Sequence, residues 1–163
     1  MKNKLVTLLG LCCATLAATA VADEAQTAEP TVAVASAAQK LTLLNGKINP
    51  DAQVYFYLHS ASWCGPCRAA MPGIVDIYKA MKEDGRAEII LVSYDKTPEG
   101  AAEYIAHYQS DMPTVWAGDD ALSMLPSFAH SRGIPMVTVV DAQGKVIAQG
   151  ASTRIHQWKQ YVK

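Results

Sequence analysis

Two cysteines, Cys64 and Cys67, stand three positions apart in the run Ser-Trp-Cys-Gly-Pro-Cys-Arg that begins at Ser62. They are the only cysteines beyond residue 13. This spacing allows both sulfur atoms to lie in the first turn of one helix, where orphan N–H groups and the helix dipole stabilise negative charge. Because the thiolate is the reactive form of cysteine, the pair is a candidate for thiol–disulfide chemistry.

Two other interpretations of the cysteine pair remain open, a structural disulfide and half of a metal site. A disulfide between residues three apart closes a very small loop, so it constrains little of the unfolded chain. A tetrahedral zinc site needs two further ligands, and the sequence contains neither a second Cys-x-x-Cys nor a His-x-x-x-His. The motif therefore favours a redox-active dithiol, with no metal expected.

The residues on either side of the motif predict a strand followed by a helix. Residues 54–58 are five consecutive large apolar residues, which is typical of a buried strand. Downstream, four apolar residues recur at helical spacing: Met71, Ile74, Val75 and Tyr78. Pro66 falls near the first helical position, where its missing N–H costs nothing. The pattern therefore places Cys64 after a strand and at the start of a helix.

At these residues the sequence resembles the thioredoxin superfamily. The Trp-Cys-Gly-Pro-Cys pentapeptide matches, and Pro72 falls where the family carries a proline that kinks the active-site helix. Residues 133–135, Gly-Ile-Pro, and the apolar run 136–140 resemble the family's cis-proline loop and the strand after it. The resemblance covers roughly residues 41–162 and is closest to the TlpA-related and tryparedoxin/nucleoredoxin types. It implies an α/β thioredoxin-like fold, with a central mixed sheet flanked by helices on both faces.

The resemblance also implies roles for individual residues. Cys64 would attack a substrate disulfide, and Cys67 would resolve the mixed disulfide that results. A cis bond before Pro135 is implied, in a loop that flanks the cysteines and pairs with an extended substrate. The residues expected to contact the substrate are Trp63, Gly65, Pro66, Ile134 and Pro135. No cofactor is implied.

The rest of the chain predicts further strands and helices in alternation, as expected for such a sheet. Residues 87–94, which are apolar apart from Glu88 and Ser93, are typical of a central strand covered on both faces. Thr97, Pro98 and Glu99 together have the pattern of a helix start. The remaining expected elements are a short strand over 41–44, a strand over 114–116, a helix around 125–130 and a last helix capped by Ser152. Residues 141–144 followed by 145–148 resemble the closing hairpin of the family.

Residues 1–22 have the pattern of a secretory signal peptide. A basic start precedes an apolar stretch over 5–18, and Ala-Val-Ala at 20–22 is a small-x-small cleavage site. We therefore expect cleavage after Ala22, a flexible linker over 23–39, and one thioredoxin-like domain over 40–163. The apolar stretch is short for a membrane span, so no membrane insertion is expected after cleavage.

Lipoprotein processing at Cys12 is the alternative to ordinary cleavage. It is less favoured because Leu11 stands where a small residue is wanted. Export would place the chain in the periplasm, where disulfides are permitted. Without residues 1–22 the chain has 12 basic and 15 acidic residues, a formal charge of −3, and no basic patch that would attract nucleic acid.

These observations predict an exported thiol–disulfide oxidoreductase. The Gly-Pro pair between the cysteines resembles the reducing members of the family, whereas strong oxidants carry a histidine next to the second cysteine. A reductase is therefore expected, with exported proteins that carry cysteines or disulfides as substrates and a membrane electron donor that recharges it. The alternatives are an oxidase or isomerase of the same fold, and a copper chaperone that uses the cysteine pair.

Two positions near the motif leave the proton-transfer base unassigned. Leu58 stands where thioredoxins carry a buried acid, and residues 69–71, Ala-Ala-Met, offer no acid on the helix after the cysteines. His59 could act as a nearby base. A hydrogen-bonded structural role for His59 is the favoured interpretation, and Trp116 is expected to pack rather than to contact substrate.

Overall fold

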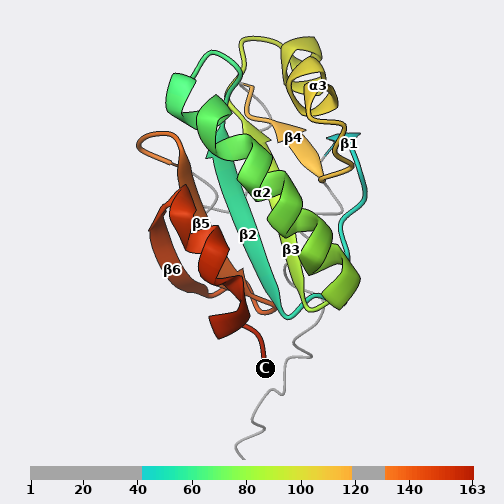
Figure 1. Cartoon of the computed structure of the whole chain (residues 1–163), viewed down its shortest axis with the longest axis vertical. Coiled ribbons are helices and arrows are strands. Elements are labelled where there is room, and N and C mark those ends of the chain that lie inside the picture. Colours follow the sequence, from blue (N-terminus) through green and yellow to red (C-terminus); the bar gives the residue numbers. More distant parts are fainter. Residues whose placement is uncertain (1–41, 119–130) are drawn as a thin grey trace, which may run out of the picture.

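The structure is a computed structural model that describes residues 42–118 and 131–163. In these residues six strands form one mixed sheet in the order β1-β4-β3-β2-β5-β6, and three helices pack against it (Figure 1). The strands are β1 (Leu43–Asn45), β2 (Val54–Ser60), β3 (Ala87–Ser93), β4 (Thr114–Trp116), β5 (Met136–Asp141) and β6 (Val146–Ala151). The helices are α2 (Gly65–Asp84), α3 (Pro98–His107) and the 3-10 helix η2 (Ser152–Gln160).

Strand β2 lies at the centre of the sheet, parallel to β3 on one side and antiparallel to β5 on the other. Every residue of β2 and β3 is buried, which confirms the prediction of two central strands. Strand β2 extends past the predicted end at Leu58 to Ser60. The polar side chain of Ser60 can be buried there because its hydroxyl hydrogen-bonds the hydroxyl of Tyr104 at 2.9 Å.

The central strands alternate their side chains between two hydrophobic cores, one on each face of the sheet. Phe56 and Leu58 pack with the apolar faces of α2, α3 and η2. Tyr55 and Tyr57 point to the opposite face and pack with residues of β3 and β4. The described helices therefore all cover one face. The predicted helix around 125–130 lies outside the described residues, as do the predicted signal peptide and linker.

Helix α2 starts at the carboxyl end of β2, as predicted, and crosses the face of the sheet (Figure 1). Pro66 lies in its first turn and Pro72 within it. The helix ends at Gly85, which adopts a left-handed conformation and donates its N–H to the carbonyl of Met81 at 2.8 Å. The strand and the helix together fix the loop that carries Cys64.

The two predicted helix caps have different outcomes. Thr97 caps α3 as expected, because its hydroxyl accepts a hydrogen bond from the N–H of Gly100 at 3.1 Å. The prediction that Ser152 caps the last helix is wrong. Ser152 is buried as the first residue of η2, and Ala151 holds the cap position without a side-chain hydrogen bond.

Glu88 is a buried carboxyl near the start of β3, at the end of the sheet opposite the cysteines. Its two oxygens accept hydrogen bonds from the N–H groups of Asn49 at 2.9 Å and Ile89 at 3.0 Å. Burial raises the pKa of Glu88 from 4.5 to about 7, against the opposing effect of these two hydrogen bonds. The native state therefore binds this proton more tightly than the unfolded chain does.

We expect the Glu88 carboxyl to make the fold less stable as pH rises. Between pH 4.5 and 7 the native state holds more protons at this site than the unfolded state, so the free energy of unfolding falls with pH, by about 3 kcal/mol in total. Glu88→Gln resembles the protonated group and should remove this loss. Urea unfolding at pH 5 and pH 8 measures the effect, and Glu83→Gln on the exposed face of α2 controls for the lost charge. Parallel pH profiles for wild type and Glu88→Gln would contradict the expectation.

Candidate active site

Cys64 and Cys67 form a disulfide at the start of α2. Cys64 is the helix cap residue, and its sulfur accepts a hydrogen bond from the N–H of Cys67 at 3.3 Å. Cys64 is slightly accessible to solvent, with 7% of the residue exposed, whereas Cys67 is only 1% exposed. After reduction, the same N–H and the helix dipole would stabilise a thiolate on Cys64. Cys64 is therefore the better placed of the two to meet a substrate.

The loop before β5 lies against the cysteine pair. The sulfur of Cys64 is 4.0 Å from the carbonyl oxygen of Ile134, and the side chain of Ile134 packs against the small cluster formed by Ala61 and the two cysteines. The Ile134–Pro135 peptide bond is cis. Ile134 lies 70 residues after Cys64 in the chain. The structure thus brings the Ile134–Pro135 loop beside Cys64.

Trp63 forms an exposed apolar surface next to Cys64. Trp63 is 60% exposed, and its indole N–H donates a hydrogen bond to the carbonyl oxygen of Tyr94 at 3.0 Å. An aromatic ring that is fixed at one edge and open to solvent can contact a partner at low cost in side-chain entropy. Gly65 and Pro66 are exposed beside it in the first turn of α2. These residues form a surface around the disulfide.

His59 does not lie in that surface. It is fully buried in β2, with Nδ1 at 3.4 Å from the hydroxyl of Tyr94 and Nε2 at 3.4 Å from the hydroxyl of Thr138. These contacts support the structural interpretation of His59. Trp116 is half-buried and donates its indole N–H to the carbonyl of Asp95 at 2.7 Å, in keeping with a packing role.

Asp95 is a residue near the site that the sequence motifs did not single out. It lies two residues beyond the end of β3 and is 6% exposed. Its carboxylate accepts hydrogen bonds from the backbone N–H and the hydroxyl of Ser62, two residues before Cys64. Strands β2 and β3 are parallel, with Ser60 opposite Ser93, so residues just beyond their carboxyl ends meet. The sequence signal that could have identified Asp95 is an acidic residue just after the strand expected next to the one that precedes the cysteines.

Within residues 42–118 and 131–163, no group of three or more His, Cys, Asp or Glu side chains is arranged to hold a metal ion. No helix in the same residues combines the length and the apolar character that crossing a bilayer requires.

Comparison with known proteins places the site in a family context. The family model described as thioredoxin-like matches residues 51–146, more than half of the chain. Mouse nucleoredoxin is 37% identical over 100 residues, which are 59% of this chain and 21% of nucleoredoxin. The thiol:disulfide interchange protein HelX of Rhodobacter capsulatus is 32% identical over 89 residues, 55% of this chain and 47% of HelX. The chain therefore spans less than half the length of these relatives.

A solved structure gives the same result for the fold. Tryparedoxin II from C. fasciculata superimposes with a TM-score of 0.59 at 27% identity, and the match covers 77% of this chain and 90% of tryparedoxin II. The predicted mixed sheet and its cysteine-bearing helix are thus those of a known fold. The cysteine pair lies within the span that the family model matches.

Proposed function

The chain belongs to the thioredoxin-like family, and on that premise we propose that it is an exported thiol–disulfide oxidoreductase that reduces disulfides in exported proteins. The observation that carries the proposal is the Cys64–Cys67 disulfide at the start of α2, with Cys64 the more exposed sulfur and the cis Ile134–Pro135 loop beside it. Its relatives include a protein named as a thiol:disulfide interchange protein.

The proposed reaction is a two-step exchange of disulfides. The Cys64 thiolate attacks one sulfur of a substrate disulfide, forms a mixed disulfide with it, and releases the other sulfur as a thiolate, which takes up a proton. Cys67 then loses its proton and attacks the Cys64 sulfur. The Cys64–Cys67 bond closes, and the second substrate thiol leaves. Two electrons pass from the dithiol to the substrate, and no cofactor takes part.

The surface around the disulfide supports a proposal for substrate contact. Trp63, the exposed residue before Cys64, offers its ring, and the carbonyl oxygen of Ile134 lies 4.0 Å from the Cys64 sulfur. Gly65 and Pro66 are also exposed. An extended peptide could pair with the backbone of the Ile134–Pro135 loop while its disulfide meets Cys64. We assign these five residues to substrate binding.

The direction and the location of the reaction rest on sequence. Gly65 and Pro66 separate the cysteines as in reducing relatives of the fold, and residues 1–22 have the pattern of a signal peptide. A reductase in an oxidising compartment must be recharged, so a membrane electron donor is part of the proposal. The proposed substrates are exported proteins with cysteines or disulfides.

Equilibration of the Cys64–Cys67 pair with glutathione tests the direction. A reductase should have a potential closer to the value of thioredoxin, about −270 mV, than to that of the oxidant DsbA, about −120 mV. Mass spectrometry after acid quenching and alkylation gives the reduced fraction at each glutathione ratio. A value near that of DsbA would replace the proposed reductase with an oxidase of the same fold.

A further inference from the structure

A buried acid lies behind the loop that carries the dithiol. The described residues contain two buried carboxyl groups, Glu88 at the start of β3 and Asp95 beyond its end. Only Asp95 contacts the cysteine loop. One of its oxygens accepts from the N–H of Ser62 at 3.0 Å and from the Ser62 hydroxyl at 2.5 Å, and the other accepts from the hydroxyl of Ser93 at 2.6 Å. Both oxygens accept hydrogen bonds, as those of an ionised carboxylate do.

The backbone around Asp95 holds the same loop from a second direction. The carbonyl oxygen of Tyr94 accepts from the Trp63 indole at 3.0 Å, and the N–H of Tyr94 donates to the carbonyl of Ser60 at 2.9 Å. The carbonyl of Asp95 is itself held by the indole of Trp116 at 2.7 Å. Ser62 and Trp63 are thus both fastened to residues 94–95. Cys64 follows them directly, so its position depends on this anchor.

The charge of Asp95 has no direct counter-ion among the described residues. Asp95 takes part in none of the ion pairs found there, which join Lys79 to Asp76, Lys82 to Asp111 and Arg86 to Asp84. The Asp95 carboxylate is hydrogen-bonded to Ser62, two residues before Cys64. The screening length is about 8 Å at physiological salt, and buried charges are screened less than exposed ones. Because Asp95 and Cys64 are both buried, we expect the carboxylate charge to reach a thiolate on Cys64.

We propose that Asp95 is a positioning residue that fixes the Ser62–Cys64 turn and whose negative charge keeps the Cys64–Cys67 pair reducing. The inference rests on the proposed function. The helix dipole and the cation of Arg68 favour a thiolate on Cys64, and the Asp95 carboxylate opposes it. A less stable thiolate makes the reduced form less stable relative to the disulfide. The dithiol then gives up its electrons more readily.

The test compares two variants that separate charge from hydrogen bonding. Asp95→Asn removes the charge and keeps an acceptor for the Ser62 N–H, whereas Ser62→Ala removes the hydroxyl donor and keeps the charge. Asp95→Asn should shift the glutathione equilibrium toward the reduced protein by about 3- to 10-fold, the magnitude of the interaction between two nearby unit charges in a partly wet environment. The thiolate of Cys64, followed by its ultraviolet absorbance, should also form at lower pH. Ser62→Ala should leave thiolate formation where it is in wild type.

Thiolate formation in the two variants is compared because a loosened loop could also hydrate Cys64 and so favour its thiolate. Ser62→Ala controls for that effect, since it removes a hydrogen bond of the same anchor and keeps the Asp95 charge. If Asp95→Asn does not fold, as judged by circular dichroism, Asp95→Ser takes its place, since it too removes the charge and leaves an acceptor. An unchanged or higher pH for thiolate formation in the neutral variant would overturn the role of Asp95. The proposed function is tested separately, by whether the wild-type protein reduces disulfides. If it does, the proposed function stands even when the role of Asp95 is overturned.

Discussion

Replacing Cys67 with serine should stop turnover and leave Cys64 joined to its substrate. The first step needs only the Cys64 thiolate, whose hydrogen bond from the backbone N–H at position 67 is retained in the variant. The second step needs the sulfur of Cys67 and cannot occur. We expect reduction of insulin disulfides to slow by on the order of 10³-fold or more, as when a member of a covalent mechanism is lost.

The matched variant is Cys64→Ser, which removes the attacking sulfur and keeps the buried one. Cys67 is 1% exposed, so it should capture little or no substrate. Cys67→Ser should therefore accumulate mixed disulfides with exported proteins, and Cys64→Ser should not. Capture by Cys64→Ser alone would show that the roles of the two cysteines are reversed.

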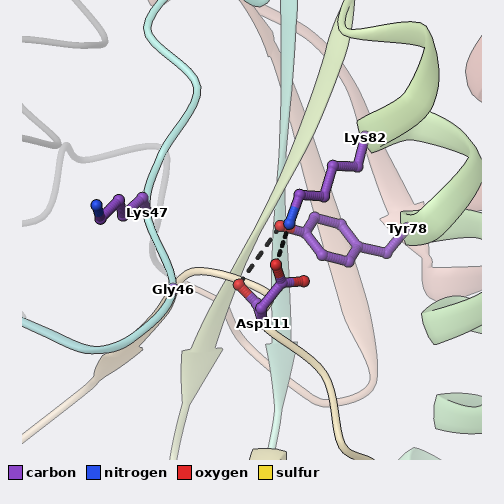
Figure 2. Close-up of a pocket in the computed structure, with 5 residues that line it drawn as sticks. All are labelled: Gly46, Lys47, Tyr78, Lys82 and Asp111. Carbon is purple, nitrogen blue, oxygen red and sulfur yellow. Dashed lines mark hydrogen bonds and ion pairs between the residues drawn. The ribbon is translucent and has the colours of Figure 1, made fainter.

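The second large effect is expected at Gly46, far from the cysteines. Gly46 has a φ of +68° and follows β1, whose residue Asn45 donates from its side chain to the carbonyls of Ser110 and Met112. A Cβ at this position would overlap the carbonyl oxygen of Asp111 and lie 2.8 Å from the nitrogen of Pro113. Figure 2 shows Gly46 beside Asp111, which pairs with Lys82 of α2. Neither backbone segment can move without breaking these contacts.

Gly46→Ala should lower the free energy of unfolding by about 3 kcal/mol or more, because the left-handed conformation and the backbone overlap both act against it. Gly85→Ala is the matched control. Gly85 also has a positive φ, +77°, but nothing lies within 4 Å of a Cβ there. It should lose only about 1–2 kcal/mol. Urea unfolding measures both variants. Equal losses would mean that the Gly46 contact contributes nothing beyond its conformation.

The parts of the fold that could be predicted from sequence are those with a local physical signal. The buried strand over 54–58, the helix with apolar residues at 71, 74, 75 and 78, and the Thr97 cap each depend on neighbours in the chain. The Ser152 cap was wrong because residues 152–160 form a tight 3-10 helix that buries Ser152. Nothing in the local pattern distinguishes a capping serine from a buried one.

The site was predictable to a similar extent. The Cys-Gly-Pro-Cys motif and its place at a helix start indicate the reactive pair, and the family resemblance indicates Ile134 and Pro135. Asp95 was missed because its partner, Ser62, is 33 residues away and is reached only through the pairing of β2 with β3. This chain has Leu58 where thioredoxins carry a buried acid, and the buried carboxylate that contacts the cysteine loop is that of Asp95, two residues beyond β3. That contact is visible only once the sheet is built.

The most direct test of disulfide exchange at Cys64 is the mass spectrum of reduced Cys67→Ser after incubation with a peptide disulfide. The exchange mechanism predicts one added peptide, removable by dithiothreitol, on the fragment that contains Cys64. An unmodified Cys64 would contradict the mechanism, provided that the variant is folded and its thiol is free.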